Sequence, residues 1–269
     1  MLPFWLSIGG LSLVQAALVA APRAPRPILP ERLQSRWWAL VLPLSIVVVI
    51  SAIALYSASA RFLTYLALVA VPPLAAVALA WLIRGARRHL AGLVVPLFAL
   101  AWAAKGALGG QTAALALSAL ACVTLGGLIV SVVPGRWLKL GIYVMAAVDT
   151  YLVATDLLQG PNAVLNTASP AADLPRLQLA SFGSALMGFG DLFVAATLGA
   201  LLAYDRRLQL RGAALAAVIG LSFDLLFFAV DELPATVPIA LTLATVELIG
   251  RAKPEREAWQ GRPKRSPSR

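Results

Sequence analysis

The chain has 269 residues, of which 60% are apolar and 13% charged, and its formal net charge is +10. Soluble domains average about 45–50% apolar and about 25% charged residues, so this composition excludes a disordered chain, collagen and a coiled coil. A single cysteine, Cys122, and a single histidine, His89, exclude a disulfide framework and a His- or Cys-based metal cluster. We expect a membrane protein with several spans and without a metal or a cofactor.

Nine apolar segments of roughly membrane-crossing length, about 20 residues each, follow one another along the chain. They are residues 3–21, 37–60, 62–83, 90–104, 112–133, 138–158, 179–204, 210–230 and 233–250. These segments predict an all-α membrane protein, a bundle of nine transmembrane helices. Residues 251–269 are polar, basic and contain proline, which predicts a disordered tail.

Basic residues are distributed unevenly among the connections between these segments. With nine crossings, all but three of the 22 Lys and Arg residues fall on one side, and the opposite side keeps Arg61, Lys105 and Arg176. Cytoplasmic loops carry the basic excess, so we expect an extracytoplasmic N-terminus and a cytoplasmic C-terminus in the plasma membrane. Topology and contact with membrane lipids then account for the positive charge, and we expect no nucleic-acid partner.

Five acids lie within the apolar segments, where a charge at the bilayer centre costs roughly 2.5–3.5 kcal/mol on insertion scales. They are Asp149, Asp156, Asp191, Asp224 and Glu247. Asp149 and Asp191 lie near the midpoints of the sixth and seventh segments, so adjacent spans can bring both carboxyls into one wet pocket. Two close carboxyls share a proton. One can then take a proton from an attacking water while the other donates to a peptide carbonyl oxygen.

Two glycines precede Asp191 in the sequence Gly188-Phe189-Gly190-Asp191. A missing side chain lets a substrate backbone approach the acid, although small residues also serve as packing contacts between membrane helices. The stretch resembles the GxGD intramembrane aspartyl proteases, the presenilin and signal peptide peptidase superfamily, and is closer to the signal peptide peptidase branch. In that family the seventh of nine spans carries Gly-x-Gly-Asp and the sixth carries the other catalytic Asp, which Asp149 matches.

The family's Pro-Ala-Leu motif opens the ninth span, where this chain has Pro234-Ala235-Thr236 with threonine in place of leucine. Val148 stands where the family usually has tyrosine before the first Asp. The resemblance covers about residues 138 to 250 and implies transmembrane segments one to five in 1–134, catalytic segments six to nine in 135–250 and a cytoplasmic tail in 251–269. It implies that six residues contact the substrate: Gly188, Phe189, Gly190, Pro234, Ala235 and Thr236.

The resemblance implies an aspartic endopeptidase that cleaves transmembrane peptides, membrane proteins or signal-peptide remnants, with Asp149 and Asp191 as the shared-proton pair. The predicted N-terminus outside the cell matches signal peptide peptidases and is opposite to presenilins. Residues 174–179 form either an edge strand for an unwound substrate or a plain loop. Three alternatives use the same acids: a prepilin-peptidase-like GxGD protease, a proton-coupled transporter and a non-catalytic membrane scaffold.

Overall fold

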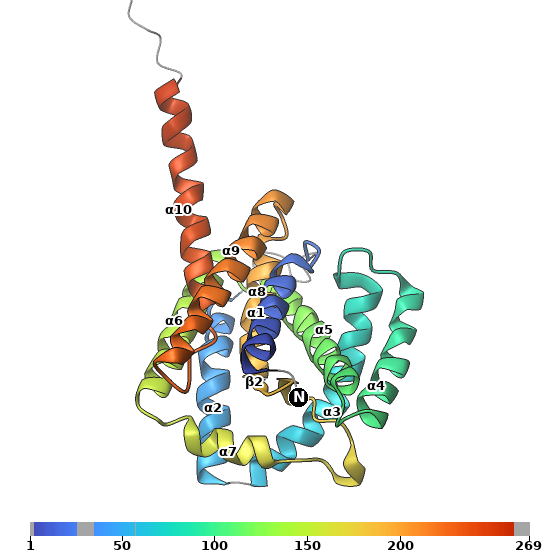
Figure 1. Cartoon of the computed structure of the whole chain (residues 1–269). Helices are drawn as coiled ribbons and strands as arrows, with labels where there is room; N and C mark the ends of the chain where they lie inside the picture. Colours follow the sequence, from blue (N-terminus) through green and yellow to red (C-terminus); the bar gives the residue numbers. More distant parts are fainter. Residues whose placement is uncertain (1–2, 26–34, 57, 261–269) are drawn as a thin grey trace, which may run out of the picture.

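The computed structural model describes residues 3–25, 35–56 and 58–260, and they are mostly helical (Figure 1). Within these ranges, five helices are long and apolar enough to cross a membrane. They are Arg36–Leu55, Ala58–Leu82, Leu108–Val132, Gly135–Ala154 and Arg206–Phe228. Four further expected segments form shorter apolar helices, Phe4–Ala20, Arg88–Ala103, Phe189–Leu202 and Val237–Ile249. The helices indicate an all-α membrane protein, whereas nine full crossings stay a prediction.

The first half of the chain forms long helices because apolar segments in lipid must satisfy their backbone hydrogen bonds internally. The Ser35 hydroxyl accepts the Trp37 N–H and so caps the second expected segment. The elements are α1 (Phe4–Ala20), η2 (Arg36–Leu40), α2 (Val41–Leu55), α3 (Ala58–Val77), η3 (Ala78–Leu82), η4 (Arg88–Leu93), α4 (Val94–Ala103) and α5 (Leu108–Val132).

The second half departs from a simple series of spans. Its elements are α6 (Gly135–Ala154), α7 (Gln159–Thr167), η5 (Ala171–Asp173), β1 (Leu179–Phe182), β2 (Ala185–Gly188), α8 (Phe189–Leu202), α9 (Arg206–Asp224), η6 (Leu225–Phe228) and α10 (Val237–Gln260). The tail expected to be disordered from residue 251 instead continues α10 to Gln260, and this helix extends beyond the bundle in Figure 1. Residues 261–269 lie outside the described residues.

The expected seventh span, residues 179–204, is a β-hairpin followed by a helix. β1 and β2 pair antiparallel, from Leu179 opposite Gly188 to Phe182 opposite Ala185. The two-residue turn contains Gly183 at φ 61°, a left-handed conformation that glycine adopts at little cost. Residues 174–178 are irregular, so an edge strand over 174–179 was wrong for all but its last residue.

The two intramembrane acids also lie differently from the expectation. Asp149 lies in the last turns of α6, which ends at Ala154 rather than at residue 158, and Asp191 lies in the first turn of α8. Neither acid is therefore at the middle of a long helix. The end of one helix and the start of the other provide the two carboxyls.

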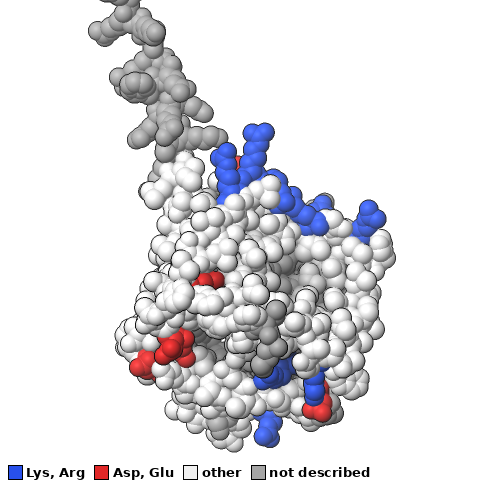
Figure 2. Space-filling view, in the orientation of Figure 1, with Lys and Arg blue, Asp and Glu red and all other residues white. Residues whose placement is uncertain are grey.

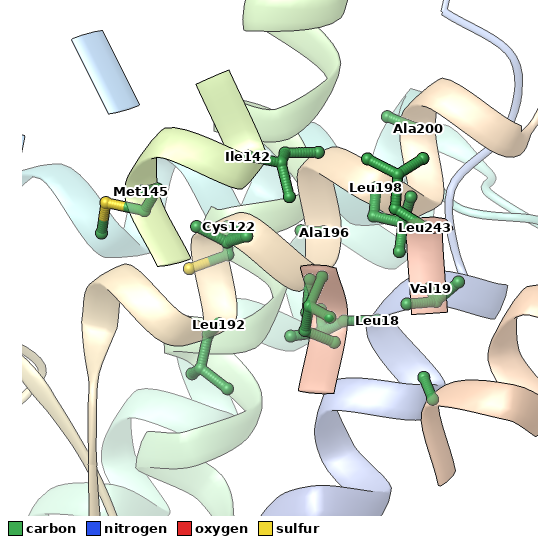
Figure 3. Close-up of a cluster of buried hydrophobic side chains, with 14 of the residues drawn as sticks. Leu18, Val19, Cys122, Ile142, Met145, Leu192, Ala196, Leu198, Ala200 and Leu243 are labelled. Atoms are coloured by element: carbon green, nitrogen blue, oxygen red, sulfur yellow. The ribbon is translucent and has the colours of Figure 1, made fainter. Parts of the chain in front are cut away.

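Helices α5 and α8 form the centre of the bundle, with α1 packed against α8 and α9. In the apolar window of α5, 72% of residues are buried, against 17% in α9. Backbones approach closely at Gly199 of α8, where an added Cβ would lie 2.7 Å from the Val19 carbonyl oxygen of α1. Figure 3 shows the same region, with side chains from α1, α5, α6, α8 and α10 meeting in one cluster. The N-terminal and C-terminal segments thus share one core.

Basic side chains gather at the upper end of the molecule in Figure 2, with a smaller group at the lower end. Three connections of the chain meet through arginine side chains: Arg84 donates to Gln209 Oε1 at 2.8 Å, and Arg206 donates to the Ala20 carbonyl oxygen at 2.7 Å. Burial, and then the charges of Arg206 and Arg23, lower the pKa of Arg84. The connections after α1, η3 and α8 therefore meet at one end, as alternating crossings predict.

The opposite end joins other connections of the chain. Lys105 forms an ion pair with Asp173, and Arg176 donates to the Asn166 carbonyl oxygen at 2.7 Å. The connection after α4 and the long connection before β1 thus lie together.

Candidate active site

A mostly apolar cavity of about 870 Å³ lies among α1, α2, α3, α6, β2, α8 and the segment before α10. Its wall contains six of the eight predicted site residues: Asp149, Gly188, Phe189, Gly190, Asp191 and Ala235. The two others, Pro234 and Thr236, are buried beside the wall without lining the cavity. Among the described residues that line it, none is Lys, Arg or His.

Asp149 is held by the segment that begins α10. Its side chain is on α6 and only 5% exposed. The Thr236 hydroxyl donates to Asp149 Oδ2 at 2.7 Å, and the Thr236 backbone N–H donates to the same oxygen at 3.4 Å. Thr236 is fully buried. Its hydroxyl is therefore bonded to the carboxyl, and the substrate contact that the resemblance implied for Thr236 stays a prediction.

Asp191 is held by its own helix terminus. Its Oδ2 accepts the backbone N–H of Gly188 at 3.0 Å, across the first turn of α8. The aligned peptide dipoles of a helix favour negative charge at this position. An added Cβ on Gly188 would lie 3.0 Å from Asp191 Oδ2, so a side chain there would crowd the carboxyl. Glycine thus leaves space beside the acid.

The two carboxyls line the same cavity, Asp149 from α6 and Asp191 from the first turn of α8. In both residues the protein donors reach Oδ2. Like charges repel strongly in a poorly polar surrounding, and two carboxyls at short range there share one proton. We call Asp149 and Asp191 the carboxyl pair. The arrangement can accept and donate a proton at the same time.

A residue that sequence reasoning missed joins the two halves of this site. Gln15 of α1, 3% exposed, donates through Nε2 to the Asp191 carbonyl oxygen at 3.4 Å and to the Ala235 carbonyl oxygen at 3.1 Å. Ser12, three residues earlier, donates to Asp224 Oδ2 at 2.8 Å. Residues three apart lie on one face of a helix. Ser12 and Gln15 are polar residues on one face of an otherwise apolar segment, and this pattern could have predicted that the face packs against polar groups.

The other intramembrane acids occupy different places. Asp224 lines the cavity together with Asp231 and Glu232. Asp156, the rival for the first acid, is exposed and is not part of the cavity wall. Glu247 pairs with Lys139 at 2.9 Å outside the cavity.

The described part of the chain contains no group of three or more His, Cys, Asp or Glu side chains that could hold a metal ion. No protein-family model, no curated protein and no solved structure matches the chain.

Proposed function

We propose that this protein is an intramembrane aspartyl protease and that Asp149 and Asp191 are its catalytic residues. One observation carries the proposal: two carboxyls, one from α6 and one from the first turn of α8, line one largely apolar cavity. The sequence Gly-Phe-Gly-Asp and Ala235 of the Pro-Ala segment line the same cavity, which supports the resemblance to GxGD proteases.

The proposed reaction needs only water and the carboxyl pair. The ionised carboxyl takes a proton from water as the water oxygen attacks the peptide carbonyl carbon, and the protonated carboxyl donates to the carbonyl oxygen. The tetrahedral intermediate then breaks its C–N bond. One carboxyl donates its proton to the leaving nitrogen, and the other, ionised carboxyl takes the proton of one hydroxyl of the intermediate as the new C=O bond forms. The products are a carboxylic acid and an amine, and the pair again holds one proton.

The proposed substrates are membrane-spanning peptide segments or signal-peptide remnants. The apolar wall suits their side chains, and the absence of side chains at Gly188 and Gly190 leaves space for a backbone next to Asp191. Strand β2 lines the cavity and offers an edge to an extended chain. By the positive-inside rule, we propose that the Arg84 and Arg206 end faces the cytoplasm and that the N-terminus lies outside.

Carboxamide variants test the proposal. Asp149→Asn and Asp191→Asn keep side-chain shape and remove proton transfer, which contributes about 10²- to 10⁴-fold to catalysis. We expect each purified variant to lose cleavage of a synthetic membrane-spanning peptide by at least that factor, measured in detergent by mass spectrometry. Asp156→Asn and Asp224→Asn are the controls, one outside the cavity and one in its wall, and both should still cleave.

Retained turnover in either carboxyl-pair variant would refute the assignment. An inactive Asp156→Asn variant together with an active Asp149→Asn variant would show that Asp156, and not Asp149, is the first catalytic acid. Acid-dependent proton flux in proteoliposomes without any cleavage would instead support the proton-coupled transporter.

A further inference from the structure

Gln178 is a buried amide in the cavity wall, and the part of the chain that the structure describes leaves its oxygen without a partner. The residue directly precedes β1, and its side chain is 7% exposed. Its Nε2 donates to the Ala168 carbonyl oxygen at 3.1 Å, whereas its Oε1 has no hydrogen-bond partner among the described residues. Buried polar atoms are almost always paired, so this oxygen calls for an explanation.

The orientation of this amide follows from its one bond. The Ala168 carbonyl oxygen can only accept, so the NH₂ group of Gln178 must face it. The amide oxygen then points elsewhere, and Gln178 lines the cavity. It presents an acceptor that cannot turn into a donor without losing the Ala168 bond.

The hairpin register relates Gln178 to the glycine-rich turn. Gln178 directly precedes Leu179, which pairs with Gly188. Gly188 is the first of the two glycines before Asp191, and its backbone N–H donates to Asp191 Oδ2 at 3.0 Å. The free acceptor is therefore associated with the part of the wall next to the carboxyl pair.

The chemistry of a membrane-spanning substrate limits which donor it can offer. Its side chains are apolar, so its donors are backbone N–H groups, which a helix keeps bonded to its own carbonyls. Hydrolysis requires a peptide bond exposed to water and the carboxyl pair, and local unwinding frees N–H groups near that bond. A freed N–H in an apolar cavity is costly unless it finds an acceptor.

We propose that Gln178 Oε1 accepts a hydrogen bond from a backbone N–H of the substrate close to the bond that is cleaved. This rests on the proposed function, because it assumes that a peptide occupies the cavity. It makes Gln178 a substrate-binding residue that recognises an unwound backbone rather than a particular side chain.

Amide-to-ester replacement tests the proposal, since an ester has no N–H. The probe is a lysine-flanked Leu–Ala peptide of about 20 apolar residues, with one amide at a time replaced. Binding is measured in detergent to the full chain carrying Asp149→Asn, so that affinity is read whether or not the chain cleaves. The same series is measured with Gln178→Leu added, and with Gln159→Leu as an exposed control outside the cavity.

We expect one ester position to weaken binding about three- to tenfold more in the protein with Gln178 than in the Gln178→Leu protein, the range of one neutral hydrogen bond. The comparison cancels the effect of each ester on the free peptide. Gln159→Leu should keep the sensitivity, and Gln178→Met should repeat the result if Gln178→Leu folds poorly.

Identical ester profiles with and without Gln178 would overturn the proposal, and so would a parent peptide that does not bind. An ester effect that depends on Gln178, combined with absent cleavage by the unmutated chain, would keep this binding site and refute only the protease activity.

Discussion

Replacing Thr236 by valine removes one hydroxyl from beside the carboxyl pair and leaves the side-chain shape almost unchanged. The hydroxyl donates to Asp149 Oδ2 at 2.7 Å in a fully buried position. The backbone N–H of Thr236, at 3.4 Å from the same oxygen, stays in the variant as a long and weak donor. The substitution therefore separates the orientation of Asp149 from the presence of its carboxyl.

The expected magnitude follows from the type of bond. A hydrogen bond to a charged group contributes about 1.5–3 kcal/mol, and about 1.4 kcal/mol corresponds to tenfold in rate. If the full bond acts in the transition state, kcat falls about 10- to 150-fold. KM should change little, because the Thr236 side chain does not line the cavity.

The assay is steady-state cleavage of a membrane-spanning peptide, with thermal unfolding to confirm a folded protein. Thr242→Val is the matched control, because Thr242 lies six residues further along in α10, is fully buried and donates to the Pro238 carbonyl oxygen at 2.8 Å. It should keep its kcat. Thr236→Ser keeps the hydroxyl and should recover most of the activity, although its lost methyl group costs about 1 kcal/mol of stability.

Two results would refute the reasoning. A folded Thr236→Val protein with unchanged kcat would show that the hydroxyl does not position Asp149 for catalysis. Equal losses in Thr236→Val and Thr242→Val would trace the effect to the packing of α10.

Two further predictions concern packing and topology. Gly199→Ala places a Cβ against the backbone carbonyls of α1 and should lower stability by about 1–3 kcal/mol or prevent folding. Gly92→Ala, with no atom within 4 Å, should change stability by less than about 0.5 kcal/mol; thermal unfolding in detergent compares the two, and equal midpoints would contradict the close approach. A cytoplasm-only reporter should be active when fused after Arg269 and silent when inserted near Asn166, and the reverse pattern would overturn the proposed orientation.

The hydropathy of the sequence predicted the apolar helices but not the β-hairpin of β1 and β2. The sequence from Leu179 to Leu202 has one charged residue, Asp191, so it reads as one uninterrupted apolar run. The local signal was Gly183-Ser184 between two short apolar stretches, a two-residue turn with glycine first. Average hydropathy cannot distinguish a strand pair buried in protein from a helix in lipid, because both are apolar.

The sequence pointed to residues that share one cavity, but not to the contacts between them. Depth along a span can be inferred from residue number, which led to Asp149 and Asp191. The rotation of a helix about its axis and the identity of its neighbours cannot be inferred in this way. The contact of Thr236 with Asp149 was therefore not predicted. The role of Gln15 was not predicted, because the backbone carbonyls to which it donates lie 176 and 220 residues further along the chain.

These long separations have a consequence for biosynthesis. Helix α1 is synthesised first, yet Ser12 and Gln15 find their partners only in α8, α9 and the segment before α10. At about 5–20 residues per second, that delay lasts roughly 10 to 40 seconds. During it, a buried amide and a hydroxyl must be accommodated by water, lipid headgroups or an insertion chaperone. The cavity can therefore be complete only after the segment before α10 has been synthesised. A chain that ends before this segment would lack part of the site.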